Sequence, residues 1–392
     1  MEHRKVNKPE HKGKKGLAAF LFSRIFIFGL MVALQVLVFV LLAYNASLSK
    51  GMSYFISFMQ FVVVIYIVND KSDPTMKLIW VIFIMFVPAL GILMYFYAKF
   101  QLGSIILKKR LEHIDVRSER YLQPDQNIYN DLQIQDKQVS MIVKYIYDNT
   151  GCPVYRNTEV TYLNCGEEKY RALIEQLEEA QDFIFMEYFI VTEGVMWDSI
   201  KAILKEKAAA GVEVRFAYDD LGSVGCLPKN FRKELAAAGI HVLTFNPFRP
   251  ALSPVMNNRN HRKITVIDGY IAYTGGFNLA DEYINQKQRF GHWKDTGLRL
   301  YGEGVYSLTL MCLELWNAFY NTNDNCKKYL PHRYHPEPFP TDGYVQPYCN
   351  SPFENETLAQ DIYLDLLYQA KEYVYIFTPY LAIEDRKSTR LN

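Results

Sequence analysis

The sequence has almost no net charge, because 43 Lys and Arg residues nearly balance 42 Asp and Glu residues. Domains that bind nucleic acids usually carry a clear positive excess. The formal net charge of +1 therefore gives no indication of a nucleic-acid partner. The local distribution is less even, since residues 1–15 form a basic tail.

Cysteine motifs and nucleotide-binding loops are also missing. The six cysteines stand at Cys152, Cys165, Cys226, Cys312, Cys326 and Cys349. None forms a CxxC pair, and no cysteine–histidine group has the spacing of a zinc site. The sequence also contains no GxxxxGK[ST] loop. We therefore expect no metal or nucleotide cofactor and no disulfide framework.

Three apolar stretches follow the basic tail. A membrane-spanning helix needs about 20 apolar residues, so we expect a membrane anchor over residues 16–100. The predicted transmembrane helices cover about 20–43, 52–69 and 78–98, and the second of them is marginal in length. Helices buried in a soluble core are the alternative. We therefore expect a multi-pass membrane protein.

The orientation of this anchor stays open. The positive-inside rule places the tail in the cytoplasm, and it argues the same for the chain after residue 98, where Lys99, Lys108, Lys109 and Arg110 stand. The tail and the chain after residue 98 cannot both lie in the cytoplasm if the chain crosses the membrane three times. Either one stretch is a re-entrant or surface helix, or the remainder of the chain lies outside.

Residues 101–150 read as a connector, and helices and strands alternate beyond it. "FIFMEYFIV" and "VEVRFAYDD" are near-continuous apolar runs that read as buried strands, and "SIKAILKEKAAAG" reads as a helix that ends at Gly211. This alternation predicts an α/β domain with a mixed or largely parallel sheet. Ligands in such sheets tend to lie at strand ends.

An internal repeat begins near the end of the chain. "EEAQDFIFMEYFI" around Ala180 resembles "YQAKEYVYIFTPYL" around Ala370. We therefore assign residues 151–335 to a first repeat and 336–384 to the start of a second. A second copy of the segment around His261 would fall beyond residue 392, so we expect the chain as given to be truncated and inactive alone. Residues 385–392, "DRKSTRLN", can be back-translated as a common sequencing adaptor, and we expect them to be read-through.

"NHRKITVIDGYIAYTGGFN" carries the chemistry. His261 and Lys263 are two residues apart, so on a strand they point to the same face. An ammonium can neutralise phosphoryl oxygens, and an imidazole can attack phosphorus. The pair therefore indicates a phosphate site, with a solvated strand end as the alternative.

Further polar and glycine residues follow this pair. Asp268 has the opposite parity, so it cannot share that face unless the strand bends at Asp268 and Gly269, and we expect it to brace the site. Gly275 and Gly276 allow close approach of backbone. Asn278 can donate a hydrogen bond to a phosphate oxygen.

The full spacing, His-x-Lys-x4-Asp-x6-Gly-Gly-x-Asn, resembles the signature of the phospholipase D superfamily. "EYFIV", "YDDLGS", "GGFNLADEYIN", "HWKDTGLRLYGEGV" and "PTMKLIWVIFIMFVPALGILMYFYAKF" resemble bacterial cardiolipin synthases. The resemblance covers about residues 54–384. It implies a phospholipase D-like α/β domain, a mixed sheet flanked by helices, preceded by N-terminal transmembrane helices.

The family resemblance also implies a mechanism. Two signatures, one per repeat, meet across an interface. One histidine attacks the phosphodiester of a phosphatidylglycerol, which gives a phosphatidyl-histidine and free glycerol. A second phosphatidylglycerol then takes the phosphatidyl group, and the product is cardiolipin. One phosphodiester replaces another, so no metal or nucleotide is needed.

The resemblance assigns roles to residues. His261 is the expected nucleophile, unless its role is exchanged with the partner histidine of the second repeat, and Lys263 and Asn278 are expected to bind phosphate. Together with Asp268, His261 and Lys263 make up the expected catalytic set. Asp295 is the candidate to hold the other ring nitrogen of His261, with an ordinary surface loop aspartate as the alternative.

Three residues on the buried strands are further candidates. Glu187 would be a charge on a buried strand, so it either lines the site or forms a structural salt bridge. Tyr218 and Asp219, at a strand end, are weaker candidates.

Two other classes of function stay open. A hydrolase of the same superfamily would use water in the second step. A non-enzymatic protein would only bind lipid or a partner. The expected partners are phosphatidylglycerol and other membrane lipids, with no nucleic acid and with the second repeat normally supplied in the same chain.

Overall fold

The computed structural model describes residues 33, 46–70, 74–99, 121–247, 259–289, 291–320, 322–341, 343–350 and 358–378. Apart from Ala33, the span expected over 20–43 lies outside these residues, as do the tail 1–15 and residues 385–392. The chain forms two compact units, Met1–Ile105 with Arg249–Asn257, and Ile106–Phe248 with Asn258–Asn392. Each is described by itself.

The described part of the first unit is helical. It contains α3 (Ala46–Asn69), α4 (Pro74–Phe86) and α5 (Pro88–Lys99). Among the described helices, α3 alone is long and apolar enough to cross a membrane, over Lys50–Asn69, with a mean hydropathy of 1.9. The structure therefore contains one candidate span where the sequence predicts two within residues 52–98.

The span expected over residues 78–98 is a hairpin of two helices. The break falls at Val87 and Pro88, where proline has no N–H to continue the helix. The rings of Trp80 and Tyr95 lie 5.5 Å apart, so α5 folds back along α4. Helices of 13 and 12 residues are about 20 Å long, shorter than the roughly 30 Å apolar layer of a bilayer.

The two ends of this hairpin lie at the same end of α3. Lys99, the last residue of α5, forms a salt bridge of 3.1 Å with Asp70, which directly follows α3. Lys77, in the first turn of α4, donates to the carbonyl oxygen of Val68. The chain therefore enters and leaves the hairpin beside the C-terminal end of α3.

The second unit is built on a mixed sheet, as the sequence predicts. Its order is β1-β7-β6-β5-β2-β3-β4. Strands β2, β3 and β4 are parallel, and every other pairing is antiparallel. The bounds are β1 (Thr158–Leu163), β2 (Phe183–Tyr188), β3 (Glu213–Asp219), β4 (His241–Phe245), β5 (Ile264–Ile267), β6 (Ile271–Gly275) and β7 (Gly297–Gly302).

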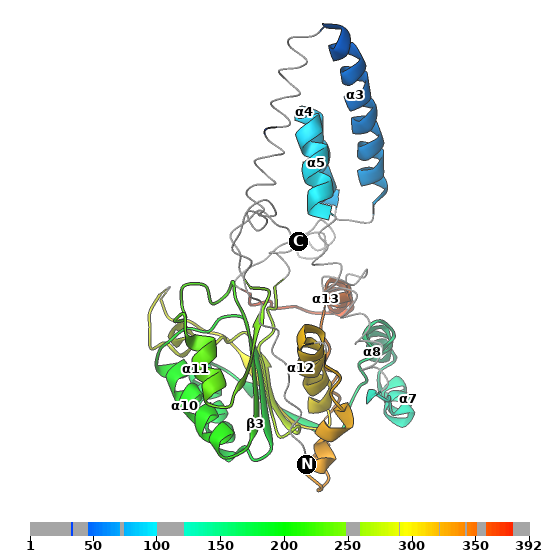
Figure 1. Ribbon diagram of the computed structural model, residues 1–392. Coiled ribbons are helices and arrows are strands. Elements are labelled where there is room, and N and C mark those ends of the chain that lie inside the picture. Colours follow the sequence, from blue (N-terminus) through cyan, green and yellow to red (C-terminus); the bar gives the residue numbers. More distant parts are fainter. Residues whose placement is uncertain are drawn as a thin grey trace. The chain divides into compact units, whose positions relative to one another are not determined.

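Helices cover both faces of this sheet. Helices α10 and α11 lie on one side of it and α12 on the other (Figure 1). The α-helices among the described residues of this unit are α7 (Gln126–Gln135), α8 (Lys137–Thr150), α9 (Gly166–Glu179), α10 (Val195–Ala209), α11 (Phe231–Ala237), α12 (Val305–Tyr320) and α13 (Leu358–Gln369). Its described part also contains the 3-10 helices η3 (Asp281–Ile284), η4 (Cys326–Tyr329) and η5 (Pro331–Arg333).

Side-chain alternation along β2 separates two cores. Phe183 and Phe185 pack with residues of α12. Ile184, Met186 and Tyr188 pack on the opposite face with residues of α9, α10 and α11. Successive strand residues point to opposite faces, so a fully apolar strand is buried on both sides. This explains why β2 reads as a near-continuous apolar run.

The segment that resembles α9 and β2 begins with helix α13. Leu358 and Ile362 of α13 pack on Ile146 of α8, and the hydroxyl of Tyr145 bonds to Asp361 at 3.1 Å. Residues 373–377, expected to form a strand, are exposed and form none. A strand needs a neighbour for its backbone hydrogen bonds, and none of the described strands pairs with this segment.

Candidate active site

His261 and Lys263 lie in the segment that leads into β5, which begins at Ile264. Both contact the ring of Phe189, which follows β2. The His261 ring centroid lies 4.7 Å from the Phe189 centroid, and Lys263 Nζ lies 5.5 Å from it. Both side chains therefore lie beside the same ring, but neither residue stands on the strand, so the shared strand face stays a prediction.

A buried carboxylate on β2 fixes the residues on either side of His261. Glu187 is 1% exposed, and its Oε1 accepts hydrogen bonds from Asn260 Nδ2 and, at 2.7 Å, from Arg262 Nε. Glu187 therefore forms a salt bridge, as one of the two readings of the sequence predicts. Its partners flank His261, so the salt bridge determines where the imidazole stands.

A second buried carboxylate, from the end of β3, holds the same segment by its backbone. Asp219 Oδ2 accepts the N–H of Asn260 at 3.1 Å, and Oδ1 accepts the N–H of Leu221 at 2.9 Å. Burial raises the pKa of Asp219, and these backbone donors oppose the shift. Its neighbour Tyr218 bonds to Thr244 on β4. Asp219 thus positions the segment, whereas Tyr218 joins two strands.

Lys263 is buried beneath this segment. Its Nζ donates to the carbonyl oxygen of His261 at 2.7 Å. Burial lowers the pKa of Lys263 to about 8, against an upward pull from Asp295. Burial and the charge of Lys263 both lower the pKa of His261. The imidazole is therefore mostly neutral at neutral pH, which is the form in which its nitrogen can attack an electrophile.

Asn278 is buried between two segments. Its Oδ1 accepts the N–H of Ile190 at 2.9 Å, and its Nδ2 donates to the hydroxyl of Tyr283 at 2.7 Å. The amide therefore joins the loop after β2 to η3. The phosphate-binding role expected of Asn278 stays a prediction.

Asp295 and the glycine pair fit against one another. A Cβ atom at Gly276 would lie 1.9 Å from Asp295 Oδ1, so only glycine leaves room for this carboxylate. Asp295 accepts the N–H of Thr296 at 2.8 Å and the indole N–H of Trp293 at 3.4 Å. In the described part of the chain its bonds thus go to its own loop and none to His261. Its charge acts on Lys263.

Asp268 lies at the other end of β5 from His261. Its carboxylate accepts the backbone N–H groups of Gln181, Asp182 and Phe183, each at 2.8 Å. Its φ of 50° places it in the left-handed region. The structure therefore brings together His261, Lys263, Glu187 and Asn278 around the loop after β2, and Asp268 braces the start of β2.

Sequence reasoning misses one residue near this site. Lys169, on α9, is fully buried, and its Nζ lies 5.3 Å from the centroid of the Tyr188 ring. A signal was present, because Lys169 stands four residues before Leu173 and eight before Leu177 on the buried side of the helix. A lysine in an apolar stripe is unusual, but Lys169 lies outside the motifs on which the family resemblance rests.

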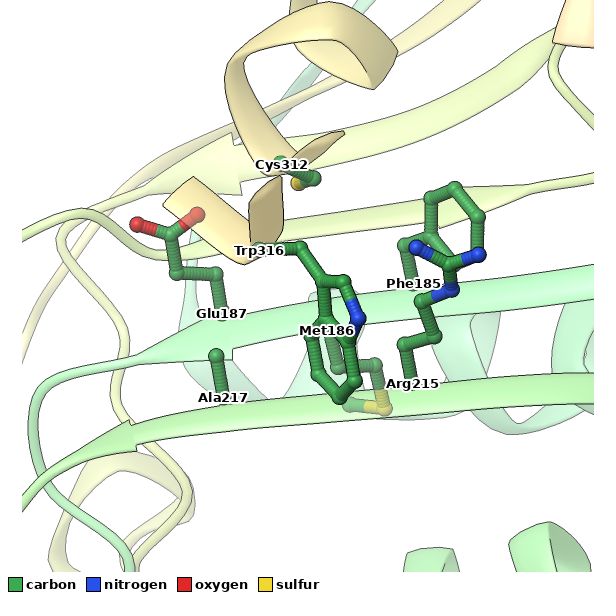
Figure 2. A pocket seen from close by; sticks show the side chains of 7 residues that line it. All are labelled: Phe185, Met186, Glu187, Arg215, Ala217, Cys312 and Trp316. Carbon is green, nitrogen blue, oxygen red and sulfur yellow. The ribbon is translucent and has the colours of Figure 1, made fainter. Parts of the chain in front are cut away.

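A small cavity lies behind Glu187, between β2, β3 and α12. Its volume is ≈ 10 Å³, room for about one water molecule. Its lining residues are Phe185, Met186, Glu187, Arg215, Ala217, Cys312 and Trp316 (Figure 2). The cavity is far too small for a lipid headgroup.

This arrangement can attack and stabilise a phosphate group. A neutral imidazole at the surface supplies a nucleophile, and the buried ammonium of Lys263 supplies a positive charge beside it. Among the residues that the structure describes, no group of three or more His, Cys, Asp or Glu side chains could hold a metal ion.

Two family models match the chain. The model described as "Cardiolipin synthase, PLD-like domain" matches residues 173–289, which include β2, β3, His261, Lys263 and Asn278. The model described as "Phospholipase_D-nuclease N-terminal" matches residues 58–99, which include the C-terminal half of α3 and both helices of the hairpin.

Solved structures give weaker likenesses. The phospholipase D family member Nuc of Salmonella typhimurium matches with a TM-score of 0.32 and 18% identity, over 41% of this chain and 94% of that one. A phosphatidylserine synthase of Haemophilus influenzae matches with a TM-score of 0.44 and 12% identity, over 65% and 62%.

Curated relatives match most of this chain. An uncharacterized protein of Streptococcus mutans is 41% identical over 82% of this chain and 69% of its own length. Proteins named cardiolipin synthase are 31% identical in Geobacillus thermodenitrificans and 33% identical in Staphylococcus aureus, over 82% and 77% of this chain. The chain spans 64% and 62% of their lengths. On these relatives and both family models, the chain belongs to the cardiolipin synthase family of phospholipase D-like proteins.

Proposed function

We propose that this protein contributes one half-site of a phosphatidyltransferase that makes cardiolipin from two molecules of phosphatidylglycerol. The observation that carries the proposal is the pair of His261 and Lys263 on one face, held through Asn260 and Arg262 by the buried Glu187. Relatives named cardiolipin synthase support the choice of lipid.

The proposed reaction has two displacements at phosphorus. A ring nitrogen of His261 forms a bond to phosphorus, and the bond from phosphorus to the oxygen of the headgroup glycerol breaks. That oxygen takes a proton from an acid, and glycerol leaves. A hydroxyl of the second phosphatidylglycerol then loses a proton, attacks the same phosphorus and releases His261. Lys263 neutralises the phosphoryl oxygens in both steps.

The acid and base of these steps are proposed to come from a second histidine. We place it on a second repeat, because α13 and residues 373–377 resemble α9 and β2 in sequence. Two histidines on opposite sides of one phosphate would allow attack in line with departure.

The membrane arrangement belongs to the same proposal. We place α3 across the bilayer and treat α4 and α5 as a re-entrant hairpin that enters and leaves on one side. The salt bridge from Asp70 to Lys99 supports this placement. If the apolar stretch 20–43 also spans, the basic tail and the chain after Lys99 share one side, and the conflict with the positive-inside rule disappears.

The proposal is tested with labelled phosphatidylglycerol in membranes of a host without cardiolipin synthases of its own. The chain is assayed alone and extended by the C-terminal part of the Staphylococcus aureus relative. We expect cardiolipin and free glycerol from the extended chain. Phosphatidic acid as the sole product would show a hydrolase instead, and no turnover by a folded, extended chain would contradict an enzyme.

A matched pair of variants ties the activity to the site. His261→Ala in the extended chain should abolish transfer. Loss of a general acid or base alone lowers a catalytic rate by about 10² to 10⁴-fold, and loss of the nucleophile should lower it further. His292→Ala removes an exposed histidine and serves as the control. A His261→Ala variant with a tenth of the parent's activity would contradict the assignment.

A further inference from the structure

Helix α9 carries a lysine in its apolar stripe. Lys169 is 0% exposed and packs on the same side of the helix as Leu173 and Leu177. Its Nζ has no hydrogen-bond partner among the described residues. Burial of an unpartnered ammonium destabilises the folded state, whereas burial of an apolar side chain of that size stabilises it. A role in packing alone would be served better by leucine or methionine.

The surroundings of Lys169 form the back of the site. Its Nζ lies 5.1 Å from the centroid of Phe277, the residue between Gly276 and Asn278, and 5.3 Å from the centroid of Tyr188 at the end of β2. Aromatic faces attract a cation but give it no hydrogen bond. The amine thus lies in an aromatic cage behind the glycine turn.

The charged groups around Lys169 belong to the site. Burial lowers the pKa of Lys169 to about 7, Asp295 raises it, and Lys263 lowers it further. Further titratable groups stand on the elements packed around α9. The hydroxyls of Tyr188 and Tyr283 bond to Thr265 and Asn278, and the hydroxyl of Tyr273 donates to the carbonyl oxygen of Ala172. Asp281 and Glu282 stand in the first turn of η3. Lys169 and Lys263 therefore repel each other, and any anion bound near Lys263 would relieve that repulsion.

We propose that Lys169 is a second, buried cation of the phosphate site, which takes up a proton from solvent when a phosphate group binds beside Lys263. It is a positioning residue, because it acts through its field without touching the lipid. The proposal rests on the function proposed above. The proton comes from water and joins Nζ, and no bond of the lipid changes in this step.

The burial of Lys169 predicts an unusual effect of pH on stability. The unfolded chain holds the proton of a lysine up to pH 10.5, whereas the folded chain releases it near pH 7. Stability should therefore rise with pH from about 7, because the unfolded state then binds more protons. Lys169→Met should melt at a higher temperature than the wild type at pH 6, and the difference should shrink by pH 9.

Anion binding separates this role from a structural one. The probe is inorganic sulfate, which does not titrate in this range, added to the purified 392-residue chain in detergent at pH 8. We expect Lys169→Met to bind sulfate roughly tenfold more weakly than the wild type. Calorimetry in buffers of different ionisation enthalpy should show that the wild type takes up protons when sulfate binds. The number of protons taken up should fall by roughly half or more in Lys169→Met.

Controls make each outcome decisive. Lys287→Met removes an exposed lysine and should bind sulfate as the wild type does. Lys263→Met should lose binding if the proposed phosphate site is correct. Equal affinity and proton uptake in Lys169→Met and the wild type, with loss in Lys263→Met, would overturn the role of Lys169 alone. No loss in Lys263→Met, or no sulfate binding by the folded wild type, would overturn both.

One variant covers the case of failed folding. Lys169→Leu extends the stripe of Leu173 and Leu177 with the residue already used there. If both apolar variants are less stable than the wild type at pH 6, Lys169 has a structural role and the proposal is overturned.

Discussion

Glu187→Gln tests whether the position of His261 depends on the buried charge of Glu187, which binds Asn260 and Arg262. Glutamine keeps the shape of the side chain and one acceptor oxygen but removes the charge that pairs with Arg262 at 2.7 Å. Removal of one partner from a buried ion pair costs about 3–5 kcal/mol. The Arg262 side chain is 26% exposed, so water recovers part of this cost, and we expect a loss of about 2–3 kcal/mol.

Two measurements read out this variant. In a domain above 200 residues, about 1 kcal/mol shifts the melting temperature by roughly 2–4 °C, so we expect Glu187→Gln to melt roughly 5–10 °C lower. The transfer rate of the folded, extended chain should fall about 100-fold, because Asn260 and Arg262 flank the nucleophile and misplacement by about 1 Å costs that much. Glu193→Gln, an exposed neighbour after β2, is the control.

A double variant separates stability from activity. In Glu187→Gln combined with Arg262→Met, no unpaired charge is left, so stability should largely recover. The rate should stay low, because the imidazole is no longer held. On the scale of roughly 2–4 °C per kcal/mol, a melting temperature within about 1 °C of the wild type would mean almost no loss of stability. If Glu187→Gln alone gives that result and transfers at the wild-type rate, the reasoning is refuted.

Three further predictions address other residues. Asp268→Asn should lower the free energy of unfolding by about 2 kcal/mol in urea titrations, since the amide keeps one acceptor oxygen and places an N–H₂ donor where the other accepted a backbone N–H. The rate per folded molecule should not change, and a large loss of rate would place Asp268 in the chemistry. Asp295→Asn should move the basic limb of the pH–rate profile to lower pH. Asp295 raises the pKa of Lys263, and the proposed reaction requires the charged form of Lys263. A basic limb at the same pH in the variant and the wild type would contradict this. Tags at residues 44–45, directly before α3, and after residue 99 should be labelled from opposite sides of the membrane, whereas a span over 78–98 would put them on the same side.

The sequence predicts the sheet and the paired site residues because their signals are local. Buried strands read as apolar runs, and the two-residue spacing of His261 and Lys263 places both side chains on the ring of Phe189. The parity argument also separates Asp268 from this pair. Its three backbone donors could not be foreseen, because they come from residues 181–183, far away in the sequence.

Other features depend on contacts that a linear pattern does not contain. Glu187 could be read as a site residue or a salt bridge, and only the pairing of β2 with β5 brings Arg262 to it. Pro88 stands inside an apolar run whose length alone indicates one span, so composition hides the hairpin. Lys169 looks like an ordinary helix lysine until its position on the buried stripe is compared with Leu173.

The central claim is that His261 carries the phosphatidyl group. The direct test is to mix phosphatidylglycerol labelled at phosphorus with the extended chain, quench the reaction rapidly, and locate the label on the protein. We predict label on His261 that is stable in alkali and lost in acid, formed as quickly as glycerol is released. The account is contradicted if the His261→Ala variant is labelled equally or if the folded wild type never acquires label during turnover.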